Sequence, residues 1–415
     1  METPGAVIVG GHVNGLGLVR ALAARNVATA VITTKPYDMA HRSRWISGHA
    51  ALLEIEEQPE RLAALLERRA VDWSGWAVIP ASDGALAALA AHKGRLAATY
   101  RVIAPDAETA RYFLDKQLML ELARSVGADM PRCYGPALEA TAALPDLCFP
   151  VVVKPNVGYR FLSRFGCKLF VAHDRSELQT CIARFAAARM HGHVFDFIPG
   201  PDSQIYAYCT YVDTRGELRG GLTVRKIRQG PPRVGVARVA EVVEDIAPLR
   251  EATIEMLQRI RFRGMAAAEF KLDPRDGRFR FLEVNGRSVI YNLLLRQAGL
   301  DVAGLAWSDH VHGRLETARP NGWPGVWTHL HADILYALLY RHTDPVGFAD
   351  FFAPYRRPKV YAVWSARDPG PFLAQWSRTA SEGASALWRR TYRDRLTDPT
   401  RPLPQAPGSC GSRAD

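Results

Sequence analysis

The sequence predicts an α/β protein with more than one domain, and three observations support this. The chain has 415 residues, a length that ordinarily forms two or three domains. Its N-terminal part alternates short apolar runs with helical periodicity, which is typical of a parallel sheet with crossover helices. Further along, two strand-like runs carry acidic residues on either side of a turn, Asp273–Gly277.

The N-terminal domain is expected to span residues 1–108. Its predicted strands are Ala6–Val9, Ala28–Thr33, Ala51–Ile55, Trp76–Pro80 and Arg101–Ala104, and its predicted helices include Leu18–Ala24 and Ala85–His92. The turn Gly10–Gly17 resembles a dinucleotide-binding fingerprint, but its glycines do not follow GxGxxG and no acid follows Thr33 to hold a ribose. A tight strand-to-helix turn is therefore favoured, and an NAD-dependent oxidoreductase is the weaker alternative.

The acid-bearing hairpin gives the strongest chemical signal. Its predicted strands are Ala267–Asp273 and Phe281–Asn285. Side-chain alternation directs Glu269 and Glu283 toward one place and puts Asn285 on the same face as Glu283. Two carboxylates and an amide oxygen are the ligands that Mg²⁺ accepts beside nucleotide phosphates. The alternative is a hairpin with solvated acids on its outer face.

Two lysines are candidate phosphate contacts. Lys154 ends the apolar run Val151–Val153, where an unpaired ammonium would be costly, so a phosphate partner is favoured over a snorkelling lysine at a strand end. Lys116 stands near the start of a helix predicted over Gln117–Val126. A positive charge there opposes the helix dipole, which indicates an anionic partner.

In their order and spacing these motifs resemble the ATP-grasp superfamily, in its carboxylate–amine ligase and D-aspartate-ligase-like branch. The resemblance covers roughly Arg111–Leu315 and is strongest at Lys154-Pro155, at Ile198-Pro199-Gly200 and over Glu269–Asn285. It implies a Rossmann-like N-terminal domain followed by a two-subdomain ATP-grasp domain over 109–320.

The composition changes after this domain. Residues 321–397 are rich in aromatic residues, histidine and proline and are expected to form a small C-terminal appendage. Residues 398–415, rich in Pro, Gly and Ser, are expected to be a disordered tail.

The resemblance implies an ADP-forming ligase that uses ATP with Mg²⁺, or with Mn²⁺ in its place. It would activate a small carboxylate as an acyl-phosphate and join it to an amine, such as an amino acid or a peptide-like substrate. Lys116 and Lys154 would hold the phosphates, while Glu269, Glu283 and Asn285 would hold the metal. The alternative is a nucleotide-binding regulatory protein with the same fold but no turnover.

The resemblance also assigns the base and ribose contacts. Phe197 and Ile198 would lie in the hinge against adenine, and Asp196 would read its amino edge. Asp202 would bind the ribose hydroxyls, although an aspartate after Pro201 is nearly as well explained as a turn residue.

Three arginines complete the implied site. Arg225 would face the γ-phosphate, with a better claim than its neighbour Lys226, and Arg228 would grip the second substrate. Arg287 would stabilise the acyl-phosphate or a later oxyanion. Between Lys154 and the hinge, Asn156–Gly166 is the candidate phosphate-covering loop, although it is poor in glycine.

Charge and cysteine content narrow the partners. The net charge of +11 without a nucleic-acid-binding motif favours an anionic small molecule over nucleic acid. Six scattered cysteines and no CxxC pair argue against zinc and fit a cytoplasmic protein. No apolar run is long enough to predict a membrane span. A homodimer is an assembly that this class of ligase allows.

Overall fold

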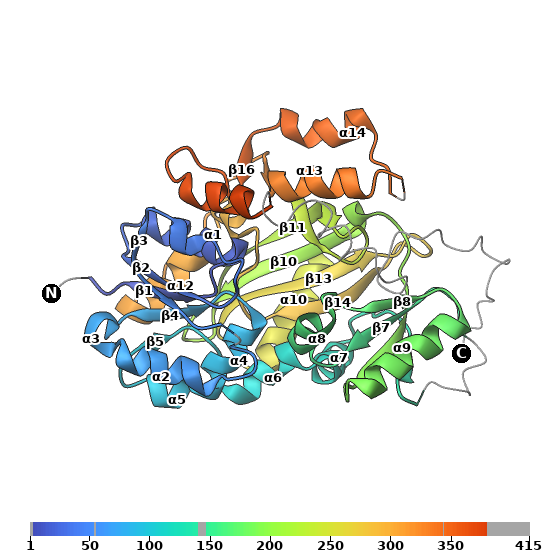
Figure 1. Cartoon of the computed structure of the whole chain (residues 1–415), viewed down its shortest axis with the longest axis horizontal. Coiled ribbons are helices and arrows are strands. Elements are labelled where there is room, and N and C mark those ends of the chain that lie inside the picture. Colours follow the sequence, from blue (N-terminus) through green and yellow to red (C-terminus); the bar gives the residue numbers. More distant parts are fainter. Residues whose placement is uncertain (1–2, 54, 140–146, 343, 380–415) are drawn as a thin grey trace.

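The computed structural model describes residues 3–53, 55–139, 147–342 and 344–379, and the tail predicted over 398–415 lies outside them. Figure 1 shows an α/β fold with three sheets side by side. The N-terminal domain lies at one end, a smaller sheet lies at the other end, and the large sheet lies between them. The predicted fold class is therefore confirmed.

The N-terminal sheet has five parallel strands in the order β3-β2-β1-β4-β5. They are β1 (Ala6–Val9), β2 (Thr29–Thr33), β3 (Ile46–Ala51), β4 (Ala77–Pro80) and β5 (Arg101–Val102). The strand predicted at Ala51–Ile55 is wrong, because β3 ends where that prediction begins. β3 is an edge strand of mostly exposed or half-buried residues, so it lacks the apolar run by which a buried strand is recognised.

Helices pack around this sheet and lead into the next domain. They are α1 (Val13–Ala23), α2 (Glu60–Arg68), α3 (Ala70–Trp73), α4 (Asp83–Ala91), α5 (Lys93–Leu96), α6 (Ala107–Leu114) and α7 (Lys116–Ser125). Asp106 and Asp115 cap α6 and α7 by accepting bonds from Thr109 N–H and Gln117 N–H, so the chain turns sharply just before Lys116.

The smaller sheet has four antiparallel strands in the order β6-β9-β7-β8. They are β6 (Cys133–Pro136), β7 (Val151–Pro155), β8 (Phe170–Ala172) and β9 (Gly192–Asp196), covered by α8 (Gly158–Phe165) and α9 (Arg175–Ala187). The expected phosphate-covering loop is therefore largely a helix, α8. The fully buried ring of Phe161 holds α8 against the sheet, because its centroid lies 5.0 Å from that of Phe170 of β8.

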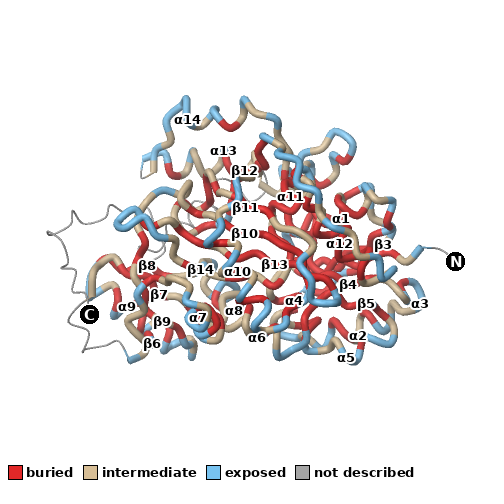
Figure 2. The backbone as a smooth tube through the Cα atoms, turned by 180° about the vertical axis from the view of Figure 1, so that it is seen from behind, coloured by how far each residue is buried: buried red, intermediate tan, exposed pale blue. Residues whose placement is uncertain are grey.

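The large central sheet has seven strands in the order β14-β13-β10-β11-β12-β15-β16. They are β10 (Ile205–Val212), β11 (Leu218–Gly230), β12 (Val236–Val243), β13 (Gly264–Leu272), β14 (Phe279–Asn285), β15 (Val326–Thr328) and β16 (Lys359–Tyr361). Figure 2 shows this sheet at the buried centre of the molecule. Helices α10 (Ala247–Arg259), α11 (Asn292–Gln297) and α12 (Val302–His312) pack against it.

The C-terminal region extends the central sheet. Its strands β15 and β16 continue the sheet beyond β12, while α13 (Leu330–Leu339) and α14 (Phe348–Phe352) lie above it in Figure 1. The carboxylate of Asp368, 1% exposed, accepts bonds from Arg20 and Ser43 of the N-terminal domain. The expected appendage thus joins two domains. No helix in the described ranges is long and apolar enough to cross a membrane.

Candidate active site

The predicted acidic hairpin forms, and its two glutamates lie directly opposite each other. Glu269 of β13 pairs with Glu283 of β14, and Asn285 pairs with Ala267 on the same face. The described residues contain no group of three or more His, Cys, Asp or Glu side chains placed to hold a metal ion. The candidate set therefore depends on two carboxylates and the Asn285 amide, a donor set that fits Mg²⁺ supplemented by phosphate oxygens and water.

Lysines from separate elements converge on these glutamates. Lys226 Nζ of β11 lies 2.7 Å from Glu269 Oε2, and Lys116 Nζ of α7 lies 3.2 Å from Glu283 Oε2. Burial acts to raise the pKa of the Glu283 carboxyl, but nearby ammonium groups outweigh it and hold that pKa well below its usual range. These ammonium groups belong to Lys116, Lys168, Lys226 and Lys154. The site is thus richer in cations than in anions.

Lys154 belongs to the same group. Burial, and next the like charge of Lys116, lower the pKa of Lys154 to about 8, while the two glutamates act in the opposite direction. Its Nζ also lies 5.6 Å from the centroid of the Phe195 ring, within cation–π range. A narrow pocket of about 10 Å³ lies beside it, between the smaller and central sheets, with Lys116, Phe195 and Leu282 in its wall.

The structure differs from the expectation for Arg225. Successive side chains of a strand point to opposite faces, and Lys226 is the residue that faces Glu269. Arg225 lies on the other face, where its Nε donates to Glu241 Oε1 at 2.8 Å. The expectation that Arg225 outranks Lys226 is thus corrected by the register of β11. Choosing between adjacent residues of a strand requires that register, which the sequence pattern does not contain.

Arg228 also has a protein partner. Its Nε and Nη2 donate to the Asp333 carboxylate at 3.0 and 2.6 Å, and both side chains are almost fully buried. The guanidinium lies over the Phe351 ring, 5.0 Å from its centroid. Arg228 therefore attaches the C-terminal region to β11, and its charged group is not directed at the glutamates.

Arg287 lies beside the glutamates and is held by the N-terminal domain. Its Nε donates to Asp83 Oδ1 at 2.6 Å. Burial lowers the pKa of Arg287, but Asp83 and then Glu283 and Glu269 outweigh it and raise that pKa. Of the three predicted arginines, Arg287 is the one whose charge interacts with Glu283 and Glu269, whereas Arg225 and Arg228 are bound to Glu241 and Asp333.

A pair of buried asparagines, Asn14 and Asn292, also links the N-terminal domain to the segment that follows β14. Asn14 Nδ2 of α1 donates to Ser288 O at 2.8 Å, and Asn292 Nδ2 donates to Asn14 Oδ1 at 2.8 Å. A Cβ added at Gly17 would lie 2.0 Å from Asn292 Oδ1, so this glycine permits close packing between domains. That packing supports a structural explanation of the Gly10–Gly17 turn.

The hinge residues lie at the end of β9, and the two predicted acids have protein donors. Asp196 accepts bonds from Tyr134 Oη at 2.9 Å and Arg275 Nη1 at 3.2 Å. Asp202 accepts bonds from the backbone N–H groups of Gln229 and Arg233 at 3.0 and 2.7 Å. Asp202 thus closes the β11–β12 turn.

Phe197 and Ile198 are buried, and the Ile198 carbonyl oxygen accepts a bond from Lys271 Nζ at 2.9 Å. Sequence reasoning did not single out Lys168 or Lys271. It did consider Lys226 but ranked that residue below Arg225. Lys226 and Lys271 are charged residues in strands that also carry apolar residues, which is a signal of a buried partner, whereas Lys168 stands in a short connection without a pattern.

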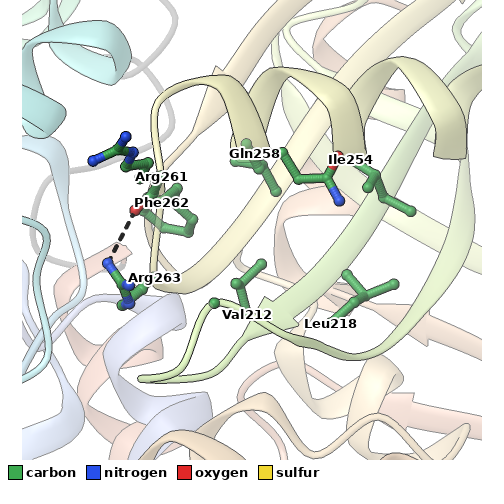
Figure 3. Close-up of a pocket in the computed structure, with 9 residues that line it drawn as sticks. Val212, Leu218, Ile254, Gln258, Arg261, Phe262 and Arg263 are labelled. Atoms are coloured by element: carbon green, nitrogen blue, oxygen red, sulfur yellow. Dashed lines mark hydrogen bonds between the residues drawn. The ribbon is translucent and has the colours of Figure 1, made fainter.

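A roomier hollow of about 180 Å³ lies at the far end of β10 (Figure 3). Apolar side chains such as Val212, Leu218 and Ile254 line it, and Arg261 and Arg263 stand at its edge. It has no carboxylate in its wall and therefore does not offer the paired acids that the predicted chemistry needs.

No family model matches the chain. The fold nevertheless has counterparts among solved structures. Biotin carboxylase from Campylobacter jejuni, solved as a β,γ-ATP complex, aligns with a TM-score of 0.60 and 14% identity over 77% of this chain and 74% of that one. L-amino acid ligase from Bacillus licheniformis aligns with a TM-score of 0.58 and 15% identity over 75% of each chain.

In sequence, the chain is similar to a D-aspartate ligase of Enterococcus faecium (strain Aus0004). The two are 27% identical over 172 residues. The match spans 40% of this chain and 41% of the length of that relative.

Proposed function

We propose that this protein is an ATP-dependent carboxylate–amine ligase. The observation that carries the proposal is the facing pair Glu269 and Glu283, surrounded by lysines from different elements beside a pocket between two sheets. The excess positive charge suits a triphosphate, and the carboxylates suit the metal that accompanies it. Lysines act here as compact point charges on phosphate oxygens.

In the proposed reaction, a carboxylate oxygen of the substrate attacks the γ-phosphorus of ATP, and the bond to the bridging oxygen of ADP breaks. Lys116, Lys154 and Lys226 neutralise charge on the phosphates. Glu269, Glu283 and Asn285 would hold Mg²⁺, which supplies further positive charge to the phosphate oxygens. The lysines now bound to the glutamates would then move to phosphate oxygens.

In the second step the acyl-phosphate reacts with the amine. The amine nitrogen attacks the acyl carbon, an oxyanion forms, and inorganic phosphate leaves while the nitrogen gives up a proton. In this proposal Arg287 stabilises that oxyanion, and its bond to Asp83 supports the role by fixing the guanidinium. The pocket of about 10 Å³ has room for about one water molecule, so in this proposal the wall, which includes Lys116 and Lys154, rearranges when the nucleotide binds.

The test is to incubate the protein with Mg-ATP and pools of amino acids and small carboxylates, and to identify the nucleotide product. D-aspartate enters the first pool because a relative is named for it. Acceptor-dependent ADP and phosphate are expected, and dividing the pool then identifies the substrates. AMP and pyrophosphate would contradict the acyl-phosphate step. Bound ATP without turnover in any pool would favour a regulatory nucleotide-binding protein.

A further inference from the structure

The hollow at the far end of β10 is a cavity that the proposed reaction does not use. It lies between the C-terminal end of α10 and the turn that joins β10 to β11 (Figure 3). Val212 in its wall pairs with Gly264, the first residue of β13, whereas Glu269 lies beyond the middle of that strand. The hollow is therefore separate from the facing glutamates.

The size and lining of the hollow suit a small apolar group. Val212 and Leu257 in its wall are 6% and 2% exposed, and Leu218 is 38% exposed, so one side of the wall faces solvent. An engineered cavity of about 150 Å³ with an aliphatic and aromatic lining is large enough to bind benzene. The volume here is about 180 Å³, so a single ring or a short branched chain would fit.

Arg261, at the edge of this hollow, stands where glycine is favoured. Its φ is +49°, in the left-handed region, just after the end of α10. The N–H groups of Arg261 and Phe262 bond to the carbonyl oxygens of Gln258 and Leu257 at 2.9 and 2.8 Å, a helix-ending arrangement in which this position is usually glycine. In the described ranges, the Arg261 guanidinium has no hydrogen bond or ion pair. A residue held in a costly conformation, with a side chain that does not support the fold, indicates a function.

Arg263 adds a second positive charge at the same edge. Its Nε donates to Thr214 O at 2.7 Å and its Nη1 to Arg261 O at 3.4 Å. These neutral carbonyls orient the guanidinium and leave its charge uncompensated. Figure 3 shows both arginines on one side of the hollow, with Leu218 and Ile254 on the other.

The acids of the adjoining turn do not balance these charges. The Asp213 carboxylate accepts a bond from Arg219 Nε at 2.5 Å and bonds from the backbone N–H groups of Arg215 and Glu217, both at 2.8 Å. Two acids, Asp213 and Glu217, thus stand beside four arginines, which are Arg215, Arg219, Arg261 and Arg263. The edge keeps an excess of positive charge.

We propose that this hollow binds an amphiphilic carboxylate. An apolar body of about one ring would fill the hollow, and the carboxylate would lie at the edge beside Arg261 and Arg263. Apolar burial would attract any molecule of the right shape, while the two guanidinium groups favour the anion over a neutral analogue. This binding needs neither nucleotide nor turnover, so it stands or falls independently of the proposed ligase function.

The experiment titrates the full chain with 3-phenylpropionate and, separately, with the neutral 3-phenylpropanamide, and follows binding by saturation-transfer NMR. We expect a Kd of about 1 mM for the acid and a Kd about fivefold higher for the amide. Arg261→Gly should raise the Kd of the acid about fivefold and leave that of the amide unchanged. The same variant should raise Tm, because glycine fits the left-handed conformation. An arginine with a purely structural role would give a lower Tm.

Arg259→Gln is the matched control, because it removes an exposed arginine of the same helix that pairs with Glu255 outside the hollow. It should change neither Kd. Leu218→Ser should weaken the acid and the amide alike, because it removes part of the apolar wall. If Arg261→Gly does not fold, Arg263→Gln replaces it, with the same expected loss for the acid alone. Equal affinity for acid and amide, an unchanged acid Kd in the folded arginine variant, or no binding by the wild type would overturn the inference.

Discussion

Two acid–base clusters share strand β11 and differ in how fully their charges are paired. Lys226 contacts Glu269 through one ion pair, and the Glu269 side chain keeps 14% of its surface exposed. Two residues further on, Arg228 binds the Asp333 carboxylate through two nitrogens, and Asp333 has no exposed surface. Tyr355 also donates to Asp333, at 2.6 Å.

Under the proposed function, this difference separates a structural cluster, Arg228 with Asp333, from a reactive cluster, Glu269 and Glu283 with their lysines. Asp333 has used its oxygens on protein donors, so a ligand would have to break buried bonds to reach it. Glu269 and Glu283 each hold a flexible lysine and retain oxygen positions that a metal ion can take. A cluster with unused bonding capacity next to a pocket is where chemistry is expected, whereas a saturated cluster holds domains together.

The strongest test of this comparison removes one charge from the reactive cluster. Glu283→Gln is expected to reduce nucleotide turnover about 1,000-fold, because the metal loses a charged ligand and Lys116 loses its partner. ADP release measured with saturating substrates reports the change. Asp276→Asn, in the exposed turn of the same hairpin, is the control and should keep turnover. Full activity in the glutamine variant would show that Glu283 is not a metal ligand.

The corresponding change in the saturated cluster should affect folding. Asp333→Asn leaves the buried Arg228 charge uncompensated, which is expected to lower the free energy of unfolding by about 3 kcal/mol. Denaturant unfolding measures this value. Glu255→Gln, which breaks the exposed pair with Arg259, should cost less than about 0.5 kcal/mol. If turnover fell 1,000-fold while stability held, Asp333 would belong to the reactive cluster.

The sequence predicted the parts of the site that depend on local patterns. Glu269 and Glu283 flank one turn, and alternation along each strand is enough to bring them together. Lys154 was recognisable because it ends an apolar run. The choice between Arg225 and Lys226 depends on which residue of β11 shares a sheet face with Glu269, and that is decided by the pairing of β10 with both β11 and β13.

The sequence did not allow contacts between distant segments of the chain to be predicted. Asp333 lies in a region expected to be a separate appendage, yet it binds Arg228 from the central sheet. The α/β class followed from periodicity, because strands and helices are decided within a few residues. The partner of a buried charge is decided by tertiary packing.

The buried charge of Lys154 is a further feature of the lysine and glutamate cluster, and its effect on stability is expected to depend on pH. Lys154→Met should lower kcat/KM for ATP about 100-fold and raise the free energy of unfolding at pH 7 by about 1 kcal/mol, because a buried charge is removed. Burial lowers the pKa of Lys154 to about 8, below the 10.5 of an unfolded lysine. Between these values the unfolded state binds more protons, so wild-type stability rises with pH.

The stability advantage of the methionine variant should therefore be constant below pH 8 and shrink as the pH rises toward 10.5. Urea unfolding of the wild type and of Lys154→Met across this pH range measures the difference between their free energies of unfolding. The contributions of the other titrating groups are common to both proteins and largely cancel in this difference. A difference that grows with pH would mean that the Lys154 charge is stabilised by the fold.

The smallest effect concerns how tightly the loop beside the reactive cluster is packed. A Cβ at Gly286, between Asn285 and Arg287, would lie 2.6 Å from Phe113 Cδ2. Gly286→Ala must displace the ring, which should cost about 1–2 kcal/mol and lower kcat by moving Asn285.

Gly94→Ala is the control, because Gly94 is helical and has no atom within 4 Å of an added Cβ; it should be neutral or stabilising. Adding Phe113→Leu to Gly286→Ala should recover part of the loss, since the smaller side chain makes room for the methyl group. Unfolding and kcat of the two single variants and the double variant form a cycle that measures this coupling. Strictly additive effects would mean that the contact between Phe113 and residue 286 does not fix the position of the loop that carries Asn285.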